Sequence, residues 1–225
     1  MKVVLFGGSG MVGSGALLEC LDDPRVTSVL SLVRNPSGLT HAKLREVRHQ
    51  DFYDYTGFEQ ELAATDACFF CLGTTSNGKS EAEYRKQTVD LTVAAARAVL
   101  ADSPGLTFCF VSGQGTDSSA RGSVMWARVK GEAENALLAM SFKAVYIFRP
   151  GIIRPLRGVR SKTRLYQFFY GLLGPVLPLV QRLFPKQITT TSAIGRAMIN
   201  VSATGYPKRV LETVDINLAG DGGSS

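Results

Sequence analysis

A glycine-rich turn directly after the first apolar segment constrains this chain more than any other feature. The segment KVVLF, residues 2–6, runs into GGSGMVGSG, where Gly7, Gly10 and Gly13 have the spacing GxxGxxG. Residues 11–21 then place apolar side chains at helical spacing. A strand, a glycine turn and a helix in this order let the backbone approach a pyrophosphate, which free N–H groups at the helix start can bind. We therefore predict a dinucleotide site here, with a purely structural turn as the alternative.

Strands and helices alternate along the rest of the chain. Short apolar runs predict strands at residues 28–33, 45–49, 67–72, 106–112, 144–148 and 209–212. Helical spacing of apolar residues predicts helices at 81–101, 126–140 and 189–201. Nearly continuous apolar strands between amphipathic helices are typical of a parallel sheet covered on both faces. The predicted fold class is α/β: a doubly wound, mainly parallel Rossmann sheet in a single domain, residues 1–225.

The composition is that of a folded globular protein, with 45% hydrophobic and 20% charged residues among 225. Charge is unevenly distributed, because residues 1–150 carry a net charge of −1 and residues 151–225 carry +7. A basic protein can bind nucleic acid, but the first two thirds of the chain lack the interleaved basic and aromatic residues of single-strand binders. We expect no nucleic-acid partner.

Four cysteines and the start of the chain bear on the compartment. Cys68 and Cys71 form a CxxC pair inside the apolar run 67–72, whereas a redox CxxC pair opens a helix. A zinc site would need two more well-placed ligands, and the chain has only two histidines. We therefore predict thiols in the core and no metal. Because the first apolar segment is too short for a secretory signal, a cytoplasmic, reducing location is expected.

The end of the second predicted strand bears on the choice of cofactor. A site selective for NAD usually has an acidic side chain there, which binds the ribose 2′-hydroxyl. This chain has Val33-Arg34-Asn35, so the acid is absent and a guanidinium is present. Arg34 can pair with a 2′-phosphate, which an acid would repel. The sequence favours NADP(H), with NAD(H) as the alternative cofactor and a solvated arginine as the alternative interpretation.

Six segments, in order along almost the whole chain, resemble the short-chain dehydrogenase/reductase superfamily in its atypical branch, and within it the Tat-interacting-protein group. The segments are FGGSGMVG (6–13), LVRNP (32–36), FFCLGTT (69–75), VSGQGTD (111–117), VKGEAE (129–134) and FRPGII (148–153). The resemblance implies an NAD(P)-binding oxidoreductase that transfers hydride to or from a small carbonyl or alcohol substrate.

The resemblance also implies a role for each matching position. The glycine turn would hold the pyrophosphate, with contacts from Gly7, Ser9, Gly10, Met11, Val12 and Gly13. The adenosine would be bordered by Arg34, Asp51 and Phe52, and the cofactor ribose by Leu72, Gly73 and Thr74. The residues expected beside the nicotinamide are Pro150, Gly151 and Ile152. A Pro-Gly pair that merely ends a strand is the alternative for this last group.

The superfamily's catalytic pair is Tyr-x-x-x-Lys on one face of a helix. The segment VKGEAE places Lys130 at the lysine position, where the resemblance implies that it also binds the nicotinamide ribose of the cofactor, but Trp126 stands where the tyrosine is expected. An indole N–H donates a hydrogen bond but is no usable acid near neutral pH. Ser112 matches the family's serine and could polarise a carbonyl. We predict a catalytic site of Lys130, Ser112 and Trp126 with an unassigned proton source; the alternatives are Trp126 packing over the helix start and a solvated Lys130.

Residues 154–184 combine a basic run with an uncharged apolar run. The uncharged part, 165–181, is interrupted by glycine and proline and is too short for a transmembrane helix. The superfamily builds its substrate cap in this region, so residues 151–200 are expected to contribute a small cap. A basic, apolar cap suits an apolar substrate with an anionic group. Peripheral contact with anionic lipid and a buried core or dimer surface are the alternatives.

Three functions follow from these observations. The first is an NADP(H)-dependent oxidoreductase acting as a monomer or homodimer. The second is an NADP(H)-sensing regulator without turnover, motivated by Trp126. The third, a sugar-nucleotide epimerase, is disfavoured because its chemistry also needs the tyrosine and because the chain after Gly151 is short for a sugar-nucleotide lobe.

Overall fold

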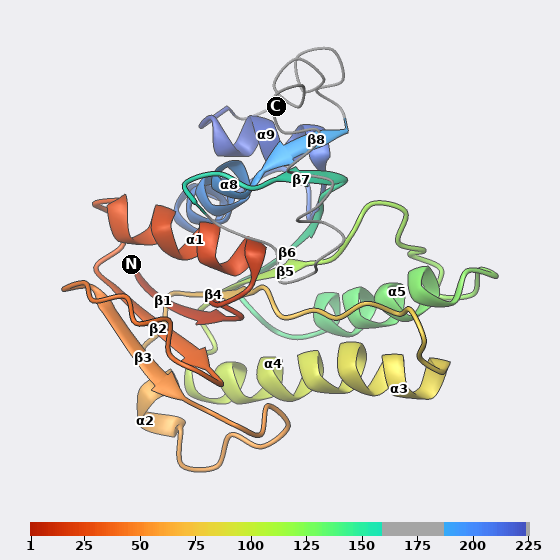
Figure 1. Cartoon of the computed structure of the whole chain (residues 1–225), viewed down its shortest axis with the longest axis horizontal. Coiled ribbons are helices and arrows are strands. Elements are labelled where there is room, and N and C mark those ends of the chain that lie inside the picture. The colour runs from red at the N-terminus through yellow and green to blue at the C-terminus, as the bar shows by residue number, and fades with distance from the viewer. Residues whose placement is uncertain (159–186, 224–225) are drawn as a thin grey trace.

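A computed structural model of the chain describes residues 1–158 and 187–223 (Figure 1). Its main element is a seven-stranded parallel sheet with the strand order β3-β2-β1-β4-β5-β6-β9. The strands are β1 (Lys2–Phe6), β2 (Ser28–Val33), β3 (Leu44–Arg48), β4 (Ala67–Phe70), β5 (Thr107–Val111), β6 (Ala144–Arg149) and β9 (Val210–Glu212). The predicted α/β, doubly wound sheet is confirmed. The order reverses between β1 and β4, where a doubly wound sheet leaves a crevice at the carboxyl ends of its strands.

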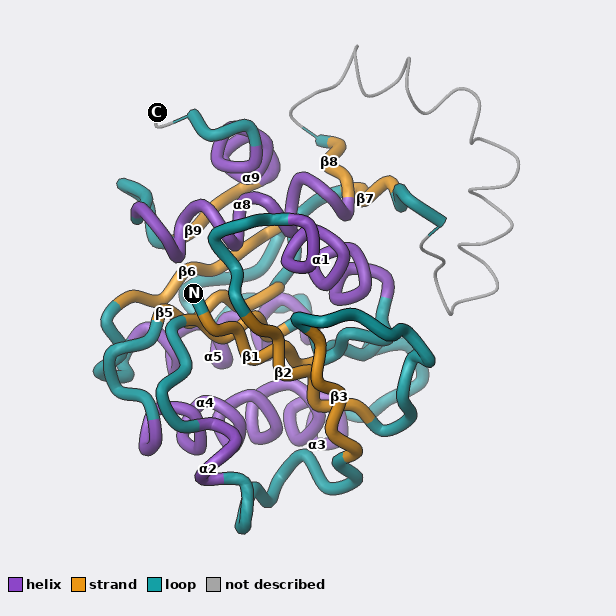
Figure 2. Tube along the Cα trace, turned by 90° about the vertical axis from the view of Figure 1, so that its left-hand side faces the viewer, coloured by secondary structure: helices purple, strands orange, loops and turns teal. Residues whose placement is uncertain are grey.

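Helices cover both faces of this sheet (Figures 1 and 2). One face carries α1 (Met11–Asp22), α8 (Thr191–Thr204) and α9 (Thr213–Gly220); the other carries α2 (Glu59–Leu62), α3 (Glu81–Arg85), α4 (Leu91–Asp102) and α5 (Met125–Leu138). Successive side chains of a strand point to opposite faces. In β1, Val4 and Phe6 pack toward α4 and α5, whereas Val3 and Leu5 pack toward α1 and α8. Burial on both sides explains why the inner strands β1, β4 and β5 are almost entirely apolar, whereas the edge strand β3, LREVR, is not.

The structure departs from the predicted elements in several places. A π-helical turn, η1 (Lys86–Asp90), interrupts the helix expected over 81–101 and separates α3 from α4. A second, two-stranded parallel sheet pairs β7 (Ile152–Arg154) with β8 (Ile188–Thr190). The sequence predicted neither of these two strands, and it also missed the helices α2 and α9. β7, β8 and α2 have three or four residues each, which is too few to show a period in the sequence.

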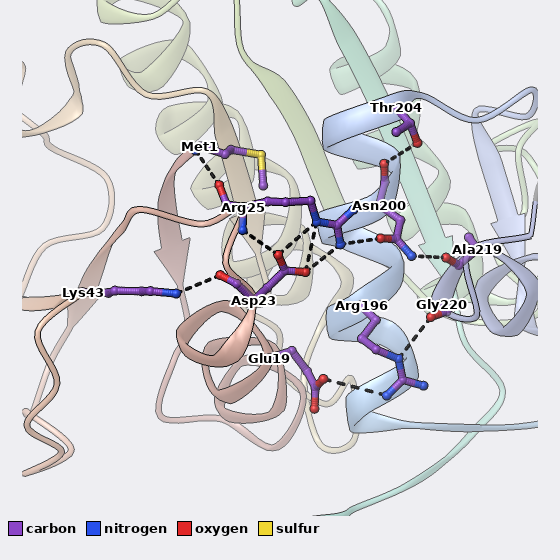
Figure 3. A network of polar contacts seen from close by, with 10 residues as sticks. All are labelled: Met1, Glu19, Asp23, Arg25, Lys43, Arg196, Asn200, Thr204, Ala219 and Gly220. Carbon is purple, nitrogen blue, oxygen red and sulfur yellow. Dashed lines mark hydrogen bonds and ion pairs between the residues drawn. The ribbon is translucent and has the colours of Figure 1, made fainter.

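Polar contacts join the helices of the α1 face near the amino ends of the strands (Figure 3). Arg25, just after α1, pairs with Asp23 at 2.6 Å and donates to Asn200 Oδ1 of α8 at 2.7 Å. The Asn200 amide donates to the Ala219 carbonyl of α9 at 2.6 Å. The amino group of Met1 donates to the Arg25 carbonyl at 2.6 Å. These contacts fix the layer at the edge opposite the crevice and so leave the carboxyl ends of the strands to a ligand.

Most of the region expected to form a cap lies outside the described residues, which stop at 158 and resume at 187. Arg157, in the basic run, pairs with Glu19 and Asp22 of α1 at 3.3 and 2.7 Å. Of the predicted cap, 151–200, the residues from Thr191 onward belong to α8, which packs on α1 in the main fold. The single-domain and cap assignments stay predictions. Among the described residues, no helix is long and apolar enough to cross a membrane.

Candidate functional site

The turn between β1 and α1 has a shape that requires glycine. Gly7 has φ +82°, and a Cβ on it would lie 2.9 Å from the carbonyl carbon of Cys71, just after β4. A Cβ on Gly13 would lie 2.1 Å from the carbonyl oxygen of Gly7. The Gly10 N–H donates to that same carbonyl at 2.8 Å and closes the turn. Side chains at these positions would therefore break the close contact of β1, β4 and α1 on which the turn depends.

The start of α1 has no side-chain cap. Its N-cap residue is Gly10, no side chain accepts a hydrogen bond there, and the first turn contains no acidic residue. The unpaired N–H groups and the helix dipole attract an anion at such a terminus. A hollow of about 360 Å³ opens beside it, and its lining includes Gly7, Ser9, Gly10, Arg34, Phe52, Leu72 and Gly73. The residues present fit a diphosphate, because the uncapped start of α1 lies beside this hollow and carries no acidic side chain in its first turn.

A second hollow, also of about 360 Å³, shares Arg34, Phe52, Leu72 and Gly73 with the first and is lined in addition by Asp51 and Thr74. The Arg34 guanidinium lies 5.8 Å from the centre of the Phe52 ring. No residue within 1–158 or 187–223 forms an ion pair with it. A flat apolar wall beside an unpaired guanidinium suits a phosphorylated adenosine. The two hollows together form what we term the crevice groove.

Some predicted cofactor residues lie outside this groove. Met11, Val12 and Gly13 form the first turn of α1 and line neither hollow. The other exceptions follow β6, where the Pro150 carbonyl accepts from the Gln114 N–H at 3.0 Å and the Gly151 N–H donates to Thr213 Oγ1 at 2.9 Å. Ile152, which begins β7, is 51% exposed. The structure therefore brings together the predicted pyrophosphate, adenosine and ribose residues, and places the predicted nicotinamide residues farther along the same sheet edge.

The groove also contains residues that the sequence did not single out. They are Leu32, Val33, Asn35, Gln50, Tyr53, Cys71, Gln87 and Leu91. Several of them adjoin a predicted residue along the chain, so their position could have been inferred from the strand ends. Gln87 could not, because it lies in the π turn η1, which interrupts a helix that looks regular in the sequence. Lys79 lines neither hollow but contacts a groove residue, because its Nζ donates to Thr74 Oγ1 at 2.5 Å.

Ser112 lies just after β5 and is tied to a buried ion pair. Its Oγ donates to Glu134 Oε1 of α5 at 2.5 Å and lies 3.1 Å from Thr116 Oγ1. Glu134 is 1% exposed and accepts from both Nε and Nη2 of Arg149, which ends β6. Arg149 also donates to Ser118 Oγ at 2.7 Å. Glu134 therefore accepts charge-assisted hydrogen bonds from Arg149 as well as the hydrogen bond from Ser112.

Lys130 and Trp126 lie one turn apart near the start of α5. The Lys130 side chain is half-buried, and its Nζ lies 5.7 Å from the centre of the Phe110 ring of β5. Burial lowers the pKa of Lys130 to about 8, and the nearby Glu134 carboxylate opposes that shift. Trp126 packs against the hydrophobic core. Its ring also lies close to Gly115, because a Cβ added to that glycine would lie 3.5 Å from the ring. The packing interpretation of Trp126 therefore has direct support, and its role beside a substrate stays a prediction.

Two other hollows lie away from the crevice. One of about 800 Å³ lies between α4 and α5, and one of about 530 Å³ lies beside Arg25 and Tyr206. Both are larger than either part of the groove, but neither is lined by the β1–α1 turn or by residues at the carboxyl end of a strand. All four cysteines are free thiols, and Cys68 is buried in the core as predicted. Among the described residues no group of three or more His, Cys, Asp or Glu could hold a metal ion.

Fungal mitochondrial proteins are similar to this chain in sequence. Protein fmp52-1, mitochondrial, of Aspergillus terreus is 33% identical over 169 residues, which cover 72% of this chain and 70% of that protein. Protein fmp52, mitochondrial, of Emericella nidulans is 29% identical over 210 residues, covering 88% and 86%. No model of a protein family matches the sequence.

These relatives overturn the expected cytoplasmic location. Over most of the chain its relatives are mitochondrial proteins, so the cytoplasmic prediction is wrong. A short apolar start argues only against secretory signals, which contain a longer apolar segment. Mitochondrial targeting uses amphipathic, arginine-rich segments, and a short apolar start says nothing about those.

Solved Rossmann structures match the fold over nearly its whole length. MoeE5 in complex with UDP-glucose and NAD has a TM-score of 0.68 at 15% identity, covering 98% of this chain and 81% of that one. A short chain dehydrogenase family protein from Francisella tularensis has a TM-score of 0.63 at 16% identity, covering 91% of each chain. At such identities the likeness shows the fold alone. That fold is a Rossmann-like α/β fold built on a parallel sheet, as the alternation of strands and helices in the sequence predicts.

Proposed function

Because this chain belongs to the FMP52 protein family and has an NAD(P)-binding Rossmann fold, we propose that it binds NADP(H) in the crevice groove and transfers hydride to or from a small carbonyl or alcohol substrate. The observation that carries the proposal is the uncapped start of α1, which opens onto the groove behind the glycine turn. No side chain competes with a diphosphate for the N–H groups there.

The preference for NADP(H) over NAD(H) is supported by Arg34. Its guanidinium lies at the wall shared by both hollows, beside the Phe52 ring. The acidic residue that would bind an unphosphorylated ribose is absent from the end of β2. A guanidinium with no ion-pair partner among the described residues adds favourable energy when a 2′-phosphate arrives, because it gives up no existing pair.

The groups that we propose for the chemistry are Ser112 and Lys130. When bound, the dinucleotide would supply or accept a hydride. Both residues contact the β5–α5 layer: Ser112 donates to Glu134 of α5, the Lys130 Nζ lies 5.7 Å from the Phe110 ring of β5, and Trp126 packs against the core. The resemblance to the Tat-interacting-protein group supports this assignment of Lys130 and Ser112. A substrate cap from the region after residue 151 belongs to the same proposal.

A second candidate function is an NADP(H)-sensing protein without turnover. Trp126 favours it, because an indole cannot replace the superfamily's acidic tyrosine. An epimerase has less support, although MoeE5 and a UDP-glucuronic acid 4-epimerase share the fold. Incubation with NADPH and a panel of apolar carbonyls separates the candidates. Tight binding with no NADPH oxidation across the panel would favour the sensor. Activity that appears only in Trp126→Tyr would show that the unsubstituted protein has lost an ancestral catalytic activity.

Calorimetric titration of the purified, nucleotide-free protein with NADPH and NADH tests cofactor binding. Trp126 is the single tryptophan, so quenching of its fluorescence provides a second readout. Gly13→Ala should weaken binding by at least about tenfold, or 1.4 kcal/mol, because its Cβ displaces the Gly7 carbonyl. Gly105→Ala is the matched control, since nothing lies within 4 Å of its Cβ. Absence of heat with both dinucleotides would refute the proposal.

Arg34→Ala tests the cofactor preference. A hydrogen bond to a charged group contributes about 1.5–3 kcal/mol, so NADPH binding should weaken by about 10- to 100-fold. NADH binding should change little, because NADH has no 2′-phosphate. Arg45→Ala provides a control. Arg45 lies on the outer strand β3, pairs with Glu61 of α2 and lines neither hollow. Equal losses for both dinucleotides would remove the role assigned to Arg34.

A further inference from the structure

The hydroxyl proton of Ser112 is already used in a hydrogen bond to Glu134. Its Oγ donates to Glu134 Oε1 at 2.5 Å, and the same carboxylate accepts two charge-assisted hydrogen bonds from Arg149. A hydroxyl carries a single proton, so the contact with Glu134 uses the one that Ser112 has. Thr116 Oγ1 donates to the Gly113 carbonyl at 2.8 Å, so it also takes no part as a proton source. Ser112 can therefore accept a hydrogen bond from a ligand, but it has no proton left to give.

Lys130 is a second proton-bearing group on the α5 side of the sheet. It lies on the α5 face that meets β5, one turn before Glu134 and one turn after Trp126. Its Nζ makes a cation–π contact with the Phe110 ring at 5.7 Å. Within residues 1–158 and 187–223, no group accepts a hydrogen bond from this Nζ. Along β5, Phe110 and Ser112 point to the same face because they are two residues apart. A half-buried ammonium with unused donors thus lies on the same side as the Ser112 hydroxyl.

We propose that Lys130 is the proton-transfer residue of this site and takes the part for which the superfamily's tyrosine is missing. This inference rests on the proposed oxidoreductase function and deepens it. When bound, the dinucleotide would supply or accept the hydride. In reduction, the Lys130 ammonium gives one proton to the carbonyl oxygen and the neutral amine is reprotonated by solvent; in oxidation, the neutral amine accepts the alcohol proton. Ser112, positioned by Glu134, can accept a hydrogen bond from the alcohol O–H only when that proton is not being exchanged with Lys130.

The surroundings of Lys130 favour such a role. Efficient proton transfer needs a group whose pKa lies near the working pH, and burial lowers the pKa of Lys130 to about 8. Its nearest acid, Glu134, is neutralised by Arg149 of β6. Three acidic groups on the helices that pack against α5 are bound elsewhere: Glu81 to Arg128, Glu83 to Ser80 and Asp90 to Arg85. Burial raises the pKa of Tyr84 on α3, so it stays neutral. The remaining charged groups there are the cations Lys86 and Arg97 and the carboxylate of Asp102, the last residue of α4.

Titration of the lysine side chains by ¹⁵N NMR on the full chain tests the inference without turnover. Comparison with Lys130→Met assigns the Lys130 signal. We expect Nζ of Lys130 to titrate near pH 8. Lys208 should titrate above the ordinary lysine value, because its contact with Asp215 at 2.6 Å raises its pKa. A Lys130 signal that titrates together with Lys208 would overturn the proposal.

Turnover with an apolar dicarbonyl, 9,10-phenanthrenequinone, and NADPH tests the catalytic part. Lys130→Met should lower kcat by about 10²–10⁴-fold, the usual contribution of general acid catalysis, while NADPH affinity changes far less. The rate of the unsubstituted protein should fall as pH rises through about 8, and that dependence should vanish in Lys130→Met.

The two proposals fail in different ways. If the unsubstituted protein binds NADPH but turns over no carbonyl, the oxidoreductase function fails. If Lys130→Met keeps its kcat, or loses only cofactor affinity, the role of Lys130 in proton transfer fails while the oxidoreductase function stands. Ser112→Ala completes the set: a kcat loss that leaves the pH dependence intact supports an accepting Ser112, and a pH dependence that disappears with Ser112 would assign the proton to Ser112 and overturn the proposal.

Discussion

Glu134 shows how strongly one residue can be constrained by partners that are distant in the sequence. It meets Ser112, 22 residues before it, and Arg149, 15 residues after it. In the sequence it looks like a solvated glutamate on an amphipathic helix. The motif VKGEAE predicts where Lys130 lies, because an i, i+4 relation fixes a shared face. The same motif says nothing about a carboxylate whose partners sit on two strands.

Glu134→Gln is expected to destabilise the protein by up to about 3–5 kcal/mol, because the buried Arg149 loses its close carboxylate partner and keeps only the 3.5 Å pair with the half-exposed Glu212. Glu132→Gln is a matched control on the same helix. Its partner Arg85 is 49% exposed, so its loss should cost at most about 1 kcal/mol. Denaturant unfolding of both variants measures the difference. Similar midpoints would show that the Glu134–Arg149 pair does not constrain α5 against the sheet.

At the scale of elements, the π turn η1 decides how α3 meets the rest of the molecule. Tyr84, in α3 just before it, is 2% exposed, and Arg85 pairs with Glu132 of α5 at 2.7 Å. A π turn holds one residue more than an α turn, so it rotates the preceding helix relative to the following one. The same turn brings Gln87 and Leu91 to the wall of the groove.

Deleting Lys86 should convert η1 into regular α-helix and turn α3 by about 100° relative to α4. Tyr84 would then leave the core, at a cost of about 2 kcal/mol and a fall of about 4–8 °C in Tm. Lys86→Ala keeps the residue count and should change Tm little, because Lys86 is exposed. Calorimetric melting of both variants tests this. An unchanged Tm in the deletion would show that the π turn does not position Tyr84.

The sequence could predict most elements but not this interruption. The long helix over 81–101 has apolar residues at helical spacing through the π turn, since Val89, Val93 and Ala96 are all in the core or packed against it. Periodicity therefore stays informative while the hydrogen-bond pattern changes. The short strands β7 and β8 escape prediction for a different reason. Each has only three residues, and they become a sheet only because residues 36 positions apart, such as Ile152 and Ile188, pair.

At the scale of the whole molecule, the strand order brings distant segments to one edge. Gly7, Arg34, Leu72 and Ser112 follow four different strands, and all lie at the carboxyl end of the sheet. This is why most groove residues could be predicted from the order of strands along the chain, since parallel strands share that end. The shape of the groove, the unused donors of Lys130 and the committed proton of Ser112 depend on side-chain packing, which no sequence period encodes.

Packing also gives the molecule a characteristic dependence of stability on pH. Burial raises the pKa values of Cys20, Cys68, Cys71 and Cys109 above 9.0. The unfolded chain then loses thiol protons that the folded protein keeps, so stability falls as pH rises above about 9. Lys130 has the opposite sign. Its folded-state pKa of about 8 lies below the ordinary 10.5, so the folded protein binds fewer protons between these values and its stability rises with pH there.

The difference between the unsubstituted protein and Lys130→Met isolates the lysine, because the thiols are common to both. Below pH 8 the buried ammonium destabilises the fold, so Lys130→Met should be more stable by about 1–3 kcal/mol at pH 7, and the gap should close between pH 8 and 10.5. Lys208→Met should be less stable than the unsubstituted protein at pH 7, because it loses the pair with Asp215. Denaturant unfolding across this pH range measures both. Two results would contradict a lowered pKa of Lys130 in the folded protein. One is a Lys130→Met variant that is less stable at pH 7, and the other is a difference in unfolding free energy that does not change with pH.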